Sequence, residues 1–142
     1  MVERVLVPID ESDRSRAALA YALEEHPDAS IVVLHVIEPR ELRAYGGIEG
    51  WVDAEQMAEQ RRARAERIVE DGRTRAEQRG VAVSTEILTG KPSRAIVEYA
   101  EDHDVDHVVI GSHGRSGVSR VLLGSVAEAV VRRSPVPVTV VR

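Results

Sequence analysis

Glycine and serine residues that could bind an anion are concentrated near the end of the chain, in the stretch IGSHGRSGVSRVLLGS at 110–125. Two residues separate Gly111 from Gly114, and nine more lead to Gly124 and Ser125. Glycine lets backbone N–H groups approach a phosphate closely, and the first N–H groups of a helix have no partner within it. The spacing is that of neither the Walker A loop nor the dinucleotide fingerprint. The stretch is therefore either a phosphate-binding loop or a surface turn in which Ser125 or a neighbour caps the last helix.

Asp10 ends the segment VPID at 7–10 and directly follows the first predicted strand. Its carboxylate could accept hydrogen bonds from the base or the sugar of a nucleotide. The alternative is that Asp10 caps the first helix, with Asp13 three residues later giving a rough capping box. From the residue types alone, the cap is the more common role for an aspartate in this place.

Histidines and acidic residues cluster in EDHDVDH at 101–107, which raises the question of a metal site. His103 and His107 lie on either side of a predicted turn, so they do not share a helical face. The segment also lacks the spacing and the central glycine of an EF-hand loop. We interpret it as a solvated turn and predict no metal ligands from the protein. His35 lies within a buried strand, where we expect a core histidine with a satisfied hydrogen bond.

Residues for covalent or acid–base catalysis are not evident. Ser112, His113 and Asp10 have the residue types of a hydrolytic triad, but neighbours in a turn rarely point at each other. No G-x-S-x-G nucleophile elbow is present in the sequence. The chain also has no P-loop lysine, arginine finger or obvious general base for fast phosphoryl transfer. We therefore predict no catalytic residues.

The composition limits the class of protein. A chain of 142 residues, 43% of them hydrophobic, is expected to form a single domain over 1–142. A net charge of −5 argues against general binding to nucleic acid or to an acidic membrane. Without cysteine there is no disulfide and no thiolate metal site. The N-terminus lacks a signal-peptide pattern and no apolar run reaches membrane-spanning length, so we expect a cytoplasmic location.

Short β-branched runs alternate with longer amphipathic stretches along the chain. Strands are predicted at 4–9, 30–37, 81–88, 106–111 and 135–141, and helices at 12–26, 53–79, 90–104 and 124–133. Such alternation is typical of a doubly wound parallel sheet with right-handed crossovers. Ligands bind to such sheets beyond the carboxyl ends of the strands, where the strand order reverses. The segments 8–12 and 111–117, after the first and fourth strands, are therefore the expected binding loops.

The glycine-serine stretch has the form G-x-x-G-x9-G-[ST], which resembles the signature of the universal stress protein family. The VLVPID opening, the GKPSRAIVEYA helix, DHVVIGSHG and the SPVPVTVVR ending are similar too, so the resemblance covers essentially the whole chain. It implies an α/β fold with a doubly wound five-stranded parallel sheet, strand order 3-2-1-4-5 and helices on both faces, like that of the adenine nucleotide alpha hydrolases. In that order the first and fourth strands are neighbours, so the two expected binding loops meet across one crevice.

The chain is similar to the ATP-binding branch of the family, because the glycines and the serine of the motif are all present. The resemblance places Pro8, Ile9 and Asp10 against adenine and ribose. It places the backbone of Val36 against adenine. It places Gly111, Ser112 and Gly114 at the ribose and α-phosphate. It places Gly124, Ser125 and Val126 at the β- and γ-phosphates. ATP is the implied nucleotide, with ADP or AMP as alternatives, and Mg or Mn would bridge the phosphates.

The family also implies a homodimer that pairs the last strand, from Val136 to Val141, with its counterpart and so removes an exposed apolar edge. The alternative is an edge that helices cover. The implied function is that of a nucleotide-dependent regulatory or stress-response protein with slow or no intrinsic ATP hydrolysis. Two other functions stay open: a genuine ATPase or phosphotransferase, and an interaction module that binds AMP, a cyclic nucleotide or no nucleotide.

Overall fold

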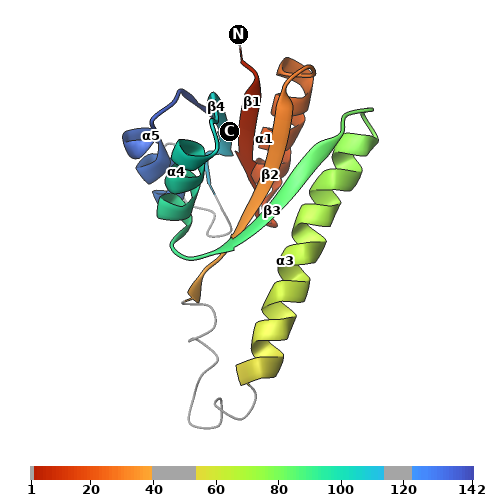
Figure 1. Cartoon of the computed structure of the whole chain (residues 1–142), viewed down its shortest axis with the longest axis vertical. Coiled ribbons are helices and arrows are strands. Elements are labelled where there is room, and N and C mark those ends of the chain that lie inside the picture. The colour runs from red at the N-terminus through yellow and green to blue at the C-terminus, as the bar shows by residue number, and fades with distance from the viewer. Residues whose placement is uncertain (1, 40–53, 114–122) are drawn as a thin grey trace.

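Five strands alternate with helices in the computed structural model, which describes residues 2–39, 54–113 and 123–142 (Figure 1). The strands are β1 (Arg4–Pro8), β2 (Ser30–Ile37), β3 (Val83–Thr89), β4 (His107–Gly111) and β5 (Val138–Val141). The helices are α1 (Asp13–Glu25), α3 (Ala54–Glu77), α4 (Pro92–Asp102) and α5 (Ser125–Arg133). None of the helices in these ranges combines the length and the apolar character that crossing a membrane requires.

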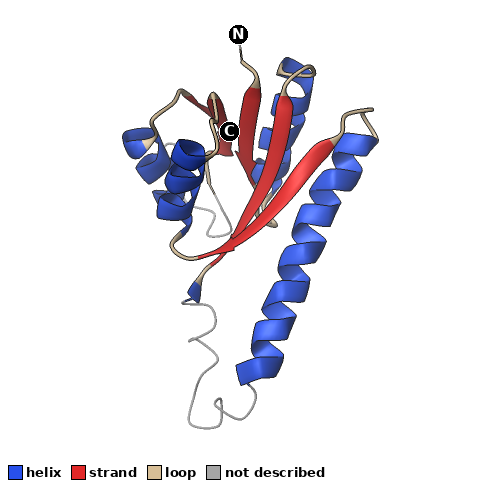
Figure 2. Ribbon diagram, viewed as in Figure 1, coloured by secondary structure: helices blue, strands red, loops and turns tan. Residues whose placement is uncertain are grey.

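The strands form one parallel sheet in the order β3-β2-β1-β4-β5, which confirms the predicted fold (Figure 2). Leu6 of β1 lies opposite Val32 of β2 on one side and opposite Val108 of β4 on the other. The chain builds outward from β1 to β2 and β3, and then returns to place β4 on the free side of β1. The strand order therefore reverses between β1 and β4. The carboxyl ends of the strands lie at the lower end of the sheet in Figure 1.

Helices cover both faces of the sheet, and each face has its own apolar core. Val5 and Val7 of β1 belong to the core beneath α1 and α3, whereas Leu6 between them belongs to the core beneath α4 and α5. All three side chains are fully buried. Successive side chains of a strand point to opposite faces, so a strand covered on both sides needs an uninterrupted apolar run. The sequence of β1 supplies that run.

Two strands, β3 and β5, begin two or more residues later than predicted because turns occupy the residues before them. Gly80 adopts the left-handed conformation with φ 74°, and the N–H of Val81 donates to the carbonyl of Ala76 at 3.0 Å. These residues complete the end of α3, so β3 begins at Val83. β5 likewise begins at Val138, after a turn closed by a serine hydroxyl.

The segment 101–107, predicted to be a solvated turn, contributes its last residue to β4. His107 is half-buried, with Nε2 2.6 Å from Thr139 Oγ1 and its ring centre 5.4 Å from that of His26. Burial, and to a lesser degree the charge of His26, lower the pKa of His107. Asp106 accepts the N–H of Arg4 at 2.8 Å, and this hydrogen bond lowers the pKa of the Asp106 carboxyl. The Asp106 contact joins the start of β4 to β1, and the Thr139 contact joins it to β5.

Candidate functional site

A cavity of about 580 Å³ lies at the carboxyl ends of β1, β2 and β4, where the strand order reverses. This is the place at which doubly wound sheets bind ligands, and the volume is typical of small-molecule sites. Eight of the ten predicted site residues line the cavity: Pro8, Ile9, Asp10, Val36, Gly111, Gly124, Ser125 and Val126. Ser112 is not part of its wall. Gly114 lies outside the residues that the structure describes.

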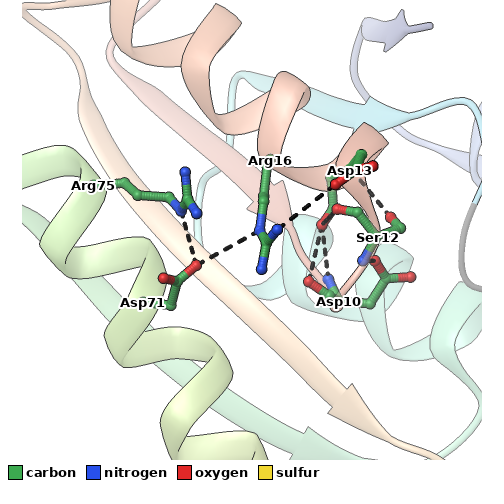
Figure 3. Close-up of polar contacts among 7 residues, drawn as sticks. Asp10, Ser12, Asp13, Arg16, Asp71 and Arg75 are labelled. Atoms are coloured by element: carbon green, nitrogen blue, oxygen red, sulfur yellow. Dashed lines mark hydrogen bonds and ion pairs between the residues drawn. The ribbon is translucent and has the colours of Figure 1, made fainter.

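Asp10 forms a tight turn between β1 and α1 (Figure 3). Its Oδ1 accepts the N–H of Ser12 at 2.7 Å, and its carbonyl accepts the hydroxyl of Ser15 at 3.0 Å. The N-cap of α1 is Ser12, whose hydroxyl accepts the N–H of Ser15 at 3.2 Å. The prediction that Asp10 is the cap is therefore wrong, because Asp10 lies two residues before the cap position. Within the described part of the chain Asp10 Oδ2 accepts no hydrogen bond, which leaves it available to a ligand.

The end of β2 presents backbone groups to the cavity. The carbonyl of Leu34 accepts the N–H of Ile9 at 2.8 Å on the β1 side, and the carbonyl of Ile37 accepts the N–H of Gly90 at 2.9 Å on the β3 side. Successive residues direct their backbone groups to opposite edges of a strand, so Val36 faces the β1 side. The pairing of β1 with β2 ends at Leu34. The N–H and C=O of Val36 therefore lie beyond the end of β1, at the cavity.

His35 differs from its prediction. It is half-buried rather than part of the core, and it lines the cavity. Its Nδ1 lies 2.8 Å from the carbonyl oxygen of Ile9. Because the N–H of Ile9 already pairs with β2, this contact occupies the second backbone group of Ile9 as well. Ile9 therefore offers the cavity its side chain rather than its backbone.

Gly111 is required at the end of β4 by the packing of α1. A Cβ atom at this position would lie 2.8 Å from the carbonyl carbon of Arg14, 2.9 Å from its oxygen and 3.0 Å from the nitrogen of Ser15. Contacts this short with backbone atoms do not occur for real Cβ atoms. The glycine thus lets the first turn of α1 lie directly against β4. Close packing against α1 is thus a reason for the glycine in addition to the predicted approach of an anion.

Ser112, the first residue after β4, is hydrogen-bonded to neighbours on both sides. The N–H of Ser112 donates to the carbonyl of Val141 and the carbonyl of Ser112 accepts the N–H of Gly124, each at 2.7 Å. Ser112 Oγ lies 3.1 Å from His113 Nδ1, so these two side chains do meet, contrary to expectation. Asp10 bonds within its own turn instead, and the three residues form no triad.

The first turn of α5 faces the cavity without a capping side chain. Gly124 is the N-cap, in agreement with the alternative that Ser125 or a neighbour has this role, and among the described residues no side-chain cap hydrogen bond is made. The first helical hydrogen bond runs from the N–H of Glu128 to the carbonyl of Gly124 at 2.9 Å. The N–H groups of Ser125, Val126 and Ala127 precede it, and all three residues line the cavity. Such free N–H groups and the helix dipole favour an anion.

Charged residues that the sequence analysis missed also line the cavity. Arg64 binds both carboxylate oxygens of Glu11, Nε to Oε1 at 2.7 Å and Nη2 to Oε2 at 2.9 Å, and joins α3 to the loop after β1. Arg61 lines the cavity from the preceding turn of α3. Arg61 and Arg64 lie one helical turn before Ala65 and Ile68, on the same face of α3. This spacing in the sequence could have predicted that the two arginines face the sheet and not the solvent.

A second ion-pair group joins α1 to α3 away from the cavity. Arg16 of α1 lies 3.6 Å from Asp13 and 3.9 Å from Asp71, which also binds Arg75 at 2.8 Å (Figure 3). These side chains are substantially exposed, and exposed pairs contribute at most about 1 kcal/mol each. The pairs therefore orient the two helices more than they stabilise the fold.

Comparison with known proteins identifies the family. The profile described as the universal stress protein family matches residues 1–142. The chain belongs to this family. It is 31% identical to universal stress protein MJ0531 of Methanocaldococcus jannaschii, over all of this chain and 83% of that protein. It is 30% identical to universal stress protein MJ0577 of the same organism, over all of this chain and 96% of that protein.

Solved structures of the family share the fold. The MJ0577 structure matches with a TM-score of 0.85 at 31% identity, covering 99% of this chain and 96% of that one. A universal stress protein in complex with cAMP matches with a TM-score of 0.68 at 26% identity, covering 99% and 97%. A family protein of Arabidopsis thaliana with AMP bound has a TM-score of 0.69 at 20% identity over 98% and 90%, a likeness of fold alone. Nucleotides are thus bound in structures of other family members.

The contact at Gly111 gives a prediction about stability. We expect Gly111→Ala to lower the free energy of unfolding by about 1–3 kcal/mol, because its Cβ must displace the backbone of α1. Gly72→Ala is the matched control. Its Cβ would meet only side-chain methyl groups, those of Ile9 and Val33 at 3.1 Å and that of Leu19 at 3.6 Å. Gly72 lies within a helix, which favours alanine over glycine by about 1 kcal/mol. Urea unfolding of both variants tests the difference, and equal stabilities would contradict the role assigned to Gly111.

Proposed function

We propose that this protein binds ATP in the cavity at the strand-order reversal and acts as a nucleotide-dependent regulator. The observation that carries the proposal is the uncapped start of α5, whose free N–H groups face the same cavity as the Asp10 turn and the end of β2. These three features supply an anion site, a carboxylate acceptor and a backbone edge. They correspond to the phosphates, the ribose and the base of a nucleotide.

The base is assigned to the β1–β2 side of the cavity. Pro8 and the side chain of Ile9 give apolar walls, and the backbone N–H and C=O of Val36 give one donor and one acceptor. Adenine presents a donor and an acceptor side by side on its edge, which suits a strand backbone. Asp10, through Oδ2, would accept a ribose hydroxyl. In this arrangement the nucleotide bonds to the Val36 backbone and to Asp10 Oδ2, which the fold leaves without partners among the described residues.

The phosphates are assigned to the start of α5. The N–H groups of Ser125 and Val126 and the Ser125 hydroxyl would hold the β- and γ-phosphates, and Gly111 would lie near the α-phosphate with Gly114. Among the described residues no group of three or more acidic or histidine side chains could hold a metal ion. A Mg or Mn ion would therefore be bound by phosphate oxygens and water, and would neutralise phosphate charge.

Regulation rather than rapid turnover is the role proposed for this site. The only lysine of the chain, Lys91, precedes α4 and is not part of the cavity wall. Fast phosphoryl transfer requires a group that positions the attacking water. It also requires positive charge that stabilises the negative charge developing in the transition state. The groups assigned here hold the nucleotide in its ground state, so slow or absent hydrolysis is proposed, with a genuine ATPase or phosphotransferase as the alternative.

Binding is tested by denaturing the purified protein and identifying released nucleotide by mass spectrometry, followed by calorimetric titration with MgATP. We expect ATP to be released or bound, and Gly124→Val to weaken binding at least tenfold, because its side chain would crowd the phosphate site at the helix start. Gly80→Asn is the control, since asparagine tolerates the left-handed conformation and open space surrounds this remote glycine. Preferential binding of AMP or a cyclic nucleotide would favour the interaction-module alternative, and no nucleotide at all would refute the proposal.

A homodimer through β5 is also proposed. β5 is the last strand of the sheet, and all four of its residues are only partly buried in the single chain. The carbonyls of Pro137 and Val141 face β4, so by alternation the backbone of Val140 faces outward. An outward edge of valines is a template for pairing with a second copy.

Val140→Pro tests this dimer without breaking the fold. Proline removes an outward N–H but no hydrogen bond to β4, and edge strands tolerate it in such positions. Light scattering should give the wild-type protein twice the 15.6 kDa chain mass and the variant about once that mass. A monomeric wild type, or a variant that stays dimeric, would contradict pairing through β5.

A further inference from the structure

His113 is a buried histidine in the wall of the cavity with one ring nitrogen that lacks a partner. The residue is only 5% exposed. Its Nε2 is buried and has no hydrogen-bond partner among the residues that the structure describes. Leaving a buried polar atom unpaired costs free energy, so such atoms in native proteins usually meet a ligand, an ion or an ordered water. His113 therefore has a hydrogen-bonding group that the fold itself does not use.

Ser112 occupies the other ring nitrogen. Ser112 is 1% exposed, and its Oγ lies 3.1 Å from His113 Nδ1. A hydroxyl can donate a hydrogen bond to Nδ1 or accept one from it, so the direction of this contact and the tautomer of His113 depend on each other. A neutral imidazole that accepts a hydrogen bond at Nδ1 carries its own proton at Nε2. With the serine hydroxyl as the donor, Nε2 carries the ring proton and is a donor itself.

The backbone of Ser112 places His113 at the start of α5. The carbonyl of Ser112 accepts the N–H of Gly124, the N-cap of α5, at 2.7 Å. His113 is the next residue after Ser112, so it lies beside the start of that helix. His113, Gly124 and Ser125 all line the cavity. The imidazole of His113 and the first N–H groups of α5 therefore belong to the same end of one cavity. A cluster of donors without an acceptor suits an anionic ligand.

We propose that His113 Nε2–H donates a hydrogen bond to a phosphate of the bound nucleotide, and that Ser112 holds the imidazole in the tautomer that permits it. This assignment rests on the proposed nucleotide binding and adds a specificity residue to it. It also changes the role of Ser112, which positions His113 from behind the wall instead of contacting the ligand. The pair discriminates between ligands with and without phosphate.

Two substitutions at His113 separate the roles of its ring nitrogens. The side-chain amide of asparagine overlaps Nδ1 and can keep the contact with Ser112, but it cannot reach the place of Nε2. Glutamine is longer and carries its amide donor to about the place of Nε2. His103→Asn is the matched control, because His103 ends α4 and is not part of the cavity wall.

Affinities for MgATP and for adenosine are measured for each variant by calorimetry. We expect His113→Asn to bind MgATP about tenfold to hundredfold more weakly and adenosine equally well, since a hydrogen bond to a charged group is lost. His113→Gln should recover much of the MgATP affinity, and His103→Asn should bind as wild type does. An asparagine variant that binds MgATP as tightly as wild type overturns the assignment while nucleotide binding stands. A wild-type protein that binds neither ligand overturns the proposed function itself.

Imidazole nitrogen NMR of the ¹⁵N-labelled wild-type protein tests the tautomer without altering the site. We expect His113 to be protonated at Nε2 and its Nε2 signal to move with MgATP but not with adenosine. In Ser112→Ala the tautomers should mix, and MgATP affinity should fall while adenosine affinity is kept. A proton on Nδ1 in the ATP complex, or a signal indifferent to MgATP, would overturn the assignment even if the substituted proteins failed to fold.

Discussion

The close approach of α1 to Gly111 is the constraint on which the arrangement of the site depends. No side chain fits between the end of β4 and the first turn of α1, because any Cβ at Gly111 would overlap the backbone of Arg14. The helix start therefore lies directly on the strand end. Asp10, just before α1, and His113, just after β4, are brought to one cavity by this contact. The reversal of strand order makes β1 and β4 neighbours, so the loops that follow them lie side by side. The absence of a Cβ at Gly111 lets α1 pack directly on the end of β4.

The polar groups of the cavity are held by the fold before any ligand arrives. The Asp10 turn is fixed by Ser12 and Ser15, and the start of α5 is fixed by the hydrogen bond from Gly124 to Ser112. Many of the groups offered to a ligand are backbone N–H and C=O groups, which have no side-chain rotamers to order. A preorganised site of this kind loses little conformational entropy on binding. Its geometry is suited to holding a ligand.

Much of the fold could be predicted because it depends on local pattern. The apolar run of β2 predicts both of its ends, and the alternation of strands and helices predicts a doubly wound sheet. The strand order itself came from the resemblance to the family, because no local pattern says which strands are neighbours. Strand starts were misplaced where a hydrogen-bonded turn, such as that at Gly80, occupies residues of strand-like composition.

The site could be predicted only as a set of residues near one place. Residue types do not reveal which of two neighbouring polar groups caps a helix, and Ser12 rather than Asp10 has this role. They do not reveal rotamers either, so the turning of Ser112 away from the cavity and onto His113 was not predictable. Arg64 was missed because its contact with Glu11 joins residues far apart in the chain, and only the tertiary fold brings them together.

The central claim is that the cavity at the strand-order reversal is a nucleotide site, and backbone amide NMR during a titration with MgATP tests it most directly. The account predicts saturable shifts at the end of β2 around Val36, in the Asp10 turn and at Ser125 and Val126, with little change at the opposite end of the sheet around Asp106. Shifts centred on another surface, or none that saturate, would contradict it.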